Sequence, residues 1–262
     1  SKLRYHSFIE IFSLDKTKAY ETFERGKELF EELSEKDASI VPHAPYSMSI
    51  DLLKLINDEA KRNQKIITIH NQESKDESEL FLSNSGNMFE QFLEMGIPAS
   101  FLRQTGINSL QSTLPYLWDT SKILLVHNTY TTQEDLDFIS TIIKNKKLEI
   151  AYCTCPNANI YIENQLPDYN LFVRNNCSIT VGTDSLASNH QLSILEELKT
   201  ISKHFPNIPL ITLLTWSTKN GATFFGYDDL GTLEVGKTPG IILLENVNET
   251  GLNKLTKVKR II

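Results

Sequence analysis

Cysteine is scarce in this sequence, which holds three cysteines, Cys153, Cys155 and Cys177, among 262 residues. So small and odd a number does not build a disulfide framework, and we expect reduced thiols and a cytoplasmic location. The pair Cys153-x-Cys155 also lacks the two-residue spacer that is typical of zinc knuckles and redox motifs. We therefore predict that both are strand residues on one face.

Long apolar runs and an excess of positive charge are missing as well. No stretch reaches the length of about 20 residues that a membrane helix needs, so no membrane partner is expected. The formal net charge of −7 and the pI near 5.4 repel phosphate backbones, so no nucleic-acid partner is expected either. With 40% hydrophobic and 23% charged residues the chain has the composition of a globular protein, and nothing in this composition argues against a small-molecule substrate.

Short apolar runs alternate with amphipathic stretches. The runs are rich in Ile and Val, as strands buried on both faces are, and predict strands at Tyr5–Phe12, Ser39–Pro42, Lys65–Ile69, Lys122–Val126, Leu148–Tyr152 and Ser178–Val181. Between them, Ser49 is expected to cap a helix over Ile50–Asn63, and Thr131-x-x-Glu134 has the spacing of a capping box for a helix through Lys144. Further helices are expected over 191–203 and 210–218. This alternation predicts a parallel α/β fold.

The character of the chain changes after Gly226, where three β-like pieces follow: "GTLEVGK", "GIILLE" and "TKVKRII". We therefore divide the chain into a larger α/β part, residues 1–226, and a C-terminal β segment, residues 227–262. The segment contains a literal phosphate-loop match, Gly231 to Thr238. Because Pro239-Gly240 follows where that loop needs a helix to start, we interpret the match as coincidence.

Polar side chains end four of the predicted strands. "ASIVPH" ends on His43, "KIITIH" on His70, "KILLVH" on His127 and "SITVGTD" on Asp184. Each histidine alone is more often structural, but in a parallel barrel these strand ends share one face, where catalytic residues gather. Imidazole nitrogens and a carboxylate suit zinc or a similar divalent ion, which lowers the pKa of a bound water to about 7. Glu73, three residues after His70, could move protons there, or could be a solvated residue at a helix start.

The ordered set "PHAPYS", "IHNQES", "LLVHNTY", "CPNANIYI" and "GTDSLASN" resembles the amidohydrolase superfamily, in its deaminase and chlorohydrolase branch. The forms "HNQES" and "GTDSLASNHQLS" are most similar to its aminodeoxyfutalosine-deaminase-like members. The resemblance covers nearly the whole chain. It implies a TIM-type (β/α) barrel, and "GTLEVGKTPGIILLE" resembles the family's return into a small β-sandwich. It also implies one divalent metal ion, zinc or else iron, and deamination of an aminopurine-like heteroaromatic amine, with metal-bound hydroxide attacking the ring carbon.

The resemblance also implies a role for each matching residue. His70 and Asp184 would be metal ligands, and Asp184 would also activate the water. Glu73 would shuttle a proton to the ring nitrogen and on towards the leaving ammonia, while His127 would hold the attacking hydroxide or the developing tetrahedral centre. His43 would contact substrate. Asn157 would line the pocket, with packing as an equal alternative, and Arg103 would meet an anionic substrate group unless it forms a surface salt bridge.

One family motif has no counterpart here, because the His-x-His of the first barrel strand occurs nowhere in the sequence. Counting strands onto the family makes Tyr5–Phe12 the third and Ser178–Val181 the eighth, so we expect an incomplete barrel of strands 3–8. Its open edges need covering, by a second copy of the chain in a homo-oligomer or by another chain. The alternatives to a deaminase are a catalytically incompetent fragment of one, or a hydrolase of another C–N or a C–Cl bond. A phosphate-loop protein is a distant third.

Overall fold

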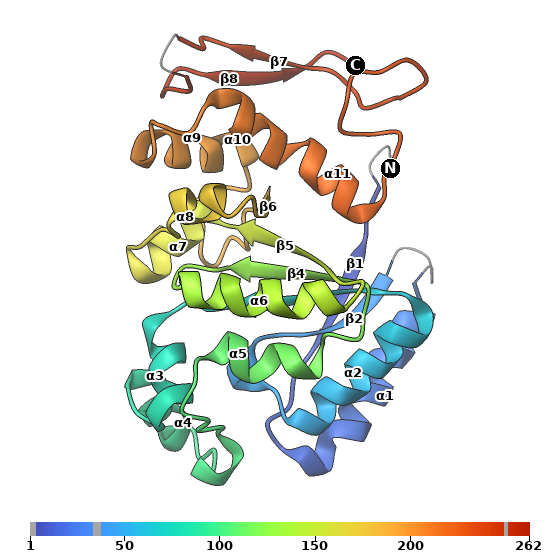
Figure 1. The fold of residues 1–262 in the computed structure, drawn as a ribbon, viewed down its shortest axis with the longest axis vertical. Coiled ribbons are helices and arrows are strands. Elements are labelled where there is room, and N and C mark those ends of the chain that lie inside the picture. Colours follow the sequence, from blue (N-terminus) through green and yellow to red (C-terminus); the bar gives the residue numbers. More distant parts are fainter. Residues whose placement is uncertain (1–3, 34–37, 249–250) are drawn as a thin grey trace. The chain divides into compact units, whose positions relative to one another are not determined.

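The structure is a computed structural model that describes residues 4–33, 38–248 and 251–262. The chain forms two compact units, residues 1–150 and 151–262 (Figure 1). The strands and longer helices of the first unit are β1 (Ser7–Ile11), α1 (Ala19–Glu31), β2 (Ala38–Pro42), α2 (Ile50–Asn63), β3 (Ile66–Asn71), α3 (Lys75–Ser83), α4 (Asn87–Glu94), α5 (Ser109–Thr113), β4 (Lys122–His127) and α6 (Gln133–Asn145).

Parallel pairing dominates the first unit. Strand β1 pairs in parallel with β2, with Glu10 opposite Val41, and β3 pairs in parallel with β4, with His70 opposite Val126. All five residues of β2 are buried, as expected for a strand covered on both faces. Helices α1 and α2 pack against each other and against these first two strands.

Backbone hydrogen bonds join the carboxyl ends of all four strands of this unit. The N–H of His43 donates to the carbonyl of Ile11, and the N–H of His70 donates to the carbonyl of His43, at 3.3 and 3.0 Å. The N–H of Asn128 continues the series to the carbonyl of Asn71 at 2.9 Å. The three strand-end histidines of this unit therefore lie at one edge, as the sequence predicted.

The helix that follows β4 corrects one prediction. Its capping box is formed by Thr132 and Asp135 rather than by Thr131 and Glu134. The Thr131 hydroxyl donates instead to Oε1 of Gln72 at 2.6 Å, so it is drawn away from the helix start. The cap of α2 is the predicted one, since the Ser49 side chain accepts from the N–H of Leu52.

Strand β5 (Glu149–Thr154) passes from the first unit into the second. The second unit continues with α7 (Pro156–Glu163), α8 (Tyr169–Arg174), β6 (Ser178–Val181), α9 (Ile194–His204), α10 (Leu210–Ser217), α11 (Lys219–Phe225), β7 (Ile242–Glu245) and β8 (Lys257–Arg260). Its part of β5 pairs in parallel with β6, whereas β7 and β8 pair antiparallel. Helices α10 and α11 pack against β6.

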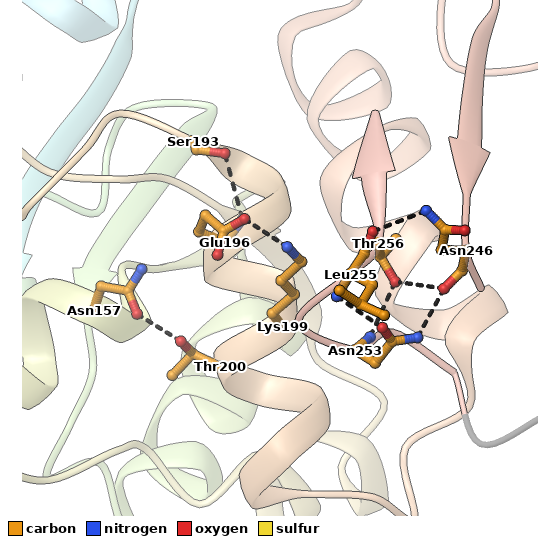
Figure 2. Close-up of polar contacts among 9 residues, drawn as sticks. All are labelled: Asn157, Ser193, Glu196, Lys199, Thr200, Asn246, Asn253, Leu255 and Thr256. Carbon is orange, nitrogen blue, oxygen red and sulfur yellow. Dashed lines mark hydrogen bonds and ion pairs between the residues drawn. The ribbon is translucent and has the colours of Figure 1, made fainter. Parts of the chain in front are cut away.

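The β7–β8 connection is held by side chains from its own residues (Figure 2). The carbonyl of Asn246 accepts from Nδ2 of Asn253 at 2.7 Å and from the hydroxyl of Thr256 at 3.1 Å. Nδ2 of Asn246 donates in turn to the carbonyl of Leu255. Asn246 itself has left-handed backbone, with φ 59°, which asparagine tolerates better than most residues.

The six predicted strands are confirmed, with small shifts at their ends. Of the three β-like pieces after Gly226, two contain strands, but "GTLEVGK" does not: residues 231–237 form turns in which Nζ of Lys237 donates to Oγ1 of Thr232. No helix starts within 236–240, so the phosphate-loop match is indeed coincidental. The division at residue 226, where α11 ends on a left-handed Gly226, stays a prediction. Within the described residues no helix has the length and apolarity to cross a membrane.

Candidate active site

His70 follows the buried core of β3 and is fixed by its neighbour on β2. Its Nδ1 lies 2.7 Å from the carbonyl oxygen of His43. A carbonyl only accepts, so Nδ1 carries the proton, and in the neutral ring Nε2 keeps its lone pair. Metal-binding histidines have this arrangement, because the second ring nitrogen is usually held by a carbonyl or carboxylate. His70 therefore fits the predicted role of a ligand to a divalent ion.

His43 stands directly after β2 and is oriented in the same way. Its Nδ1 lies 2.8 Å from the hydroxyl of Ser47, whose own proton goes to the carbonyl of Ala44. Nδ1 is then the donor, and Nε2 is left as an acceptor. Burial lowers the pKa of His43, although the nearby charge of Glu10 opposes the shift. The ring is thus neutral at pH 7, and its centroid is 5.0 Å from that of His70.

His127 and Glu73 form a pair beside His70. Nε2 of His127 lies 3.3 Å from Oε1 of Glu73, and the rings of His127 and His70 are stacked with centroids 5.4 Å apart. The Glu73 side chain is only 15% exposed, so the alternative of a solvated residue at a helix start is wrong. A largely buried carboxylate next to a buried imidazole is an arrangement suited to moving protons.

The loop after β4 has unusual backbone. His127 and Asn128 have positive φ angles of 71° and 59°, a region that costs free energy for residues other than glycine. Hydrogen bonds hold Asn128 there: its N–H donates to the carbonyls of Asn71 and Val126, its Oδ1 accepts from Nδ2 of Asn71, and its Nδ2 donates to the carbonyl of Leu125. The strained backbone of these two residues therefore sets the direction of the His127 ring.

Two fully buried carboxylates support this edge, and sequence reasoning missed both. Asp135 accepts five hydrogen bonds, from Nε2 of Gln72, Nδ2 of Asn108, Nε2 of Gln111, and the N–H and hydroxyl of Thr132. Glu77 accepts from the backbone N–H groups of Gln72 and Glu73 at 3.0 and 3.1 Å. Burial raises the pKa of Glu77 to about 7. A signal was present, since Ser74-Lys-Asp-Glu77 has capping-box spacing.

Arg103 does not form the surface salt bridge that was its alternative. Its Nη2 donates to the carbonyl of Pro45 and to Oγ1 of Thr113, both at 2.9 Å, and the guanidinium lies 5.0 Å from the centre of the Phe81 ring. Burial lowers its pKa to about 10, so the group stays charged. It thereby supports the turn that follows His43. Contact with an anionic substrate stays a prediction.

Asn157 lies in the second unit at the start of α7. Its N–H and Nδ2 donate to the buried carboxylate of Glu197 at 2.8 and 3.1 Å. Its Oδ1 accepts from the hydroxyl of Thr200 at 2.6 Å, as Figure 2 shows. Burial raises the pKa of Glu197, which also accepts from Asn189. These bonds give Asn157 a packing role against α9. Its predicted contact with substrate stays a prediction.

Asp184 also lies in the second unit, after β6. It has a left-handed φ of 57°, and its Oδ2 accepts from the hydroxyl of Ser188. Just before it, Gly182 fits where a side chain would not, because a Cβ there would lie 3.0 Å from Sγ of Cys153 and 3.2 Å from Sγ of Cys155. Both thiols thus face Gly182, as predicted, but only Cys153 is a strand residue: β5 ends at Thr154, and Cys155 is the N-cap of α7. The meeting of Asp184 with His70 stays a prediction.

Parallel strands that carry functional side chains at their carboxyl ends define a class, the (β/α)-barrel proteins with a site at that face. Comparison with known proteins gives the family. The chain matches the Amidohydrolase family over residues 7–261 and belongs to it. Its fold is accordingly an incomplete TIM-type barrel with a C-terminal β segment.

Several relatives are deaminases. The chain is 33% identical to an adenosine deaminase of Helicobacter pylori over 236 residues, covering 86% of this chain and 54% of that protein. It is 28% identical to an aminodeoxyfutalosine deaminase of Nitratiruptor, covering 92% and 54%. A solved Helicobacter pylori aminofutalosine deaminase in complex with methylthio-coformycin superposes with TM-score 0.73 at 27% identity, covering 89% and 57%. The chain thus spans about half the length of the curated relatives it matches.

Proposed function

We propose that the protein is a metal-dependent hydrolytic deaminase of an adenosine-like or related heteroaromatic amine. The observation that carries this proposal is the row of His43, His70 and the His127–Glu73 pair along one edge of parallel strands. The relatives with deaminase names support the substrate class. In such a reaction water adds to the ring carbon, the exocyclic C–N bond breaks and ammonia leaves.

His70 and Asp184 would hold a divalent ion, zinc or else iron. The donor set fits because the Nδ1 bond to His43 leaves Nε2 of His70 free, and because imidazole and carboxylate are ligands that zinc prefers. A bound ion of this kind supplies a water that is activated at neutral pH. Asp184 would accept a proton from the attacking water in our assignment.

Glu73 and His127 carry the remaining steps. Glu73 would give a proton to the ring nitrogen of the substrate, take up the hydroxyl proton of the resulting adduct and pass it to the departing amine, the role of a general acid and base. The proton held by Asp184 would then restore Glu73. His127, 3.3 Å from Glu73, stabilises charge that develops at the reacting carbon from a position fixed by its backbone. His43 orients the substrate as a neutral acceptor.

A second candidate follows from one observation, the lack of His-x-His anywhere in the 262 residues. Catalytic zinc sites normally use three protein ligands and a water. The 262-residue chain by itself would then be a partial barrel that has a pocket but does not turn over. In a further alternative, the same site hydrolyses another C–N bond or a C–Cl bond in a different substrate.

Ammonia release tests the proposal on the zinc- or iron-loaded protein that carries this chain. The panel is adenosine, 5-methylthioadenosine, S-adenosylhomocysteine and aminodeoxyfutalosine, with esters, amides and a chlorotriazine beside them. We expect turnover with at least one aminopurine, and a loss of about 100-fold or more in Glu73→Gln with the metal retained. Glu28→Gln, an exposed residue of α1, is the matched control. Hydrolysis of only the esters, amides or chlorotriazine would refute the deaminase assignment.

A further inference from the structure

Glu10 reaches the same edge from β1. A carboxylate oxygen of Glu10 and one ring nitrogen each of His43 and His70 lie within 4.8 Å of one another. Glu10 precedes Ile11, whose carbonyl accepts from the N–H of His43, so β1 delivers the carboxylate beside the turn after β2. Nothing in the sequence singled out Glu10, because it occupies the exposed position between two buried isoleucines.

The Glu10 carboxylate can accept hydrogen bonds from a ligand. Oε2 of Glu10 lies 3.7 Å from Nδ1 of His70, too far for a hydrogen bond, and the proton on that nitrogen already goes to the His43 carbonyl at 2.7 Å. The side chain is 42% exposed, and among the described residues it accepts no hydrogen bond. Its oxygens therefore remain open to donors from a ligand.

His43 offers a second acceptor next to the first. Its Nδ1 donates to the hydroxyl of Ser47, so in this tautomer Nε2 presents a lone pair. A carboxylate oxygen of Glu10 and a ring nitrogen of His43 lie within 4.8 Å of each other, a spacing that suits a ligand group with two adjacent donors. A sugar diol is such a group, and a hydroxyl that donates to a carboxylate makes one of the stronger hydrogen bonds.

Apart from Arg103 and the proposed divalent ion, the charged side chains around this pair are acidic. Besides burial, the charges of Glu73, Glu77 and Glu10 all raise the pKa of Tyr46, whose ring centroid lies 5.7 Å from that of His43. The nearby cation, Arg103, is turned to the Pro45 carbonyl and to Thr113. A negative potential of this kind attracts neutral donors and cations and repels phosphate groups.

We propose, resting on the function above, that Glu10 and His43 form an acceptor pair that binds the vicinal diol of a nucleoside-like substrate and disfavours nucleoside phosphates. Glu10 is then a specificity residue for the sugar, separate from the metal ligands. The competing assignment is that Glu10 joins His43 and His70 as a third metal ligand, since two imidazoles and a carboxylate also suit a divalent ion.

Equilibrium binding tests the pair without turnover. Isothermal titration on the metal-loaded protein in the Glu73→Gln background compares adenosine, 2′,3′-dideoxyadenosine and adenosine 5′-monophosphate, with and without Glu10→Gln. We expect adenosine to bind about tenfold or more tightly than the dideoxy compound, a gap that Glu10→Gln largely removes. We also expect Glu10→Gln to improve binding of the monophosphate. Glu28→Gln is the matched control, and the melting temperature confirms that each variant is folded.

The outcomes separate the two proposals. Equal binding of adenosine and its dideoxy analogue, binding of neither, or a gap that survives Glu10→Gln would overturn the acceptor pair. So would a loss of bound metal in Glu10→Gln with the sugar preference intact, because Glu10 would then be a ligand. Deaminase activity is judged separately by ammonia release, which depends on Glu73 and not on the sugar.

Discussion

Nε2 of His127 lies 3.3 Å from Oε1 of Glu73, and the histidine that makes this contact has a left-handed backbone. The conformation explains the contact with Glu73. The positive φ angles of His127 and Asn128 turn the chain at the end of β4, whereas an extended backbone would place the ring of His127 elsewhere. The pair is thus produced by strained backbone held in place by the Asn71–Asn128 bonds.

We first predict a difference between two substitutions of His127. Asparagine tolerates left-handed backbone and keeps an N–H donor for Glu73, whereas a β-branched valine does neither. His127→Val should therefore be less stable than His127→Asn by about 1–2 kcal/mol in urea unfolding. Both variants should lose turnover. Equal stabilities would mean that the backbone at 127 carries no strain.

Asp135 should be far more sensitive than its helix neighbour Asp137. In Asp135→Asn an NH₂ group replaces one oxygen and faces donors, so at least one of the five hydrogen bonds is lost within the buried interior. We expect a loss of about 2 kcal/mol or more of the free energy of unfolding, together with lower kcat, because Gln72 stands between His70 and Glu73. Asp137→Asn, exposed on the same helix, should change stability by less than about 0.5 kcal/mol.

Stability should fall as pH rises through the range set by Glu77. Its folded pKa of about 7 exceeds the value of about 4.3 expected in the unfolded chain, so the folded state binds the extra proton between these values. The contribution is full below about pH 4.3 and is lost as pH rises to about 7 and above, amounting to roughly 3 kcal/mol. Glu77→Gln should remove this component of the pH dependence. A slope unchanged in the variant would assign it to another group.

The 262-residue chain alone should retain well under one equivalent of zinc after dialysis. Only His70 and Asp184 are assigned as ligands, whereas a catalytic zinc site normally has three from the protein. Metal content by mass spectrometry should fall further in His70→Ala and in Asp184→Asn, with Asp137→Asn as the control. Near-stoichiometric zinc with substantial turnover would show that another residue completes the site.

Much of this arrangement could be predicted because strand ends obey a simple rule. Residues that follow buried parallel strands meet at one edge, so His43, His70 and His127 could be placed together from apolar runs alone. Glu77 and Asp135 could not, because their burial depends on loops that come together only in the fold. Sequence spacing also cannot distinguish Thr131 from Thr132 as the helix cap, because the Thr131 hydroxyl is bound by Gln72, which is distant in sequence. Glu10 was hidden by its exposed position in β1.

The bonds that meet at Asp135 have a consequence for motion. The loop after β3, through Gln72, and the loop after β4, through Thr132, end on the same buried oxygen, Oδ2 of that carboxylate. Opening either loop breaks both the bond from Gln72 to Asp135 and the bond from the Thr131 hydroxyl to Gln72, so the two loops open as one cooperative unit. Amide hydrogen exchange should therefore report a single opening free energy for Gln72 and Thr132, and any flap that admits substrate has to be formed by other segments of the protein.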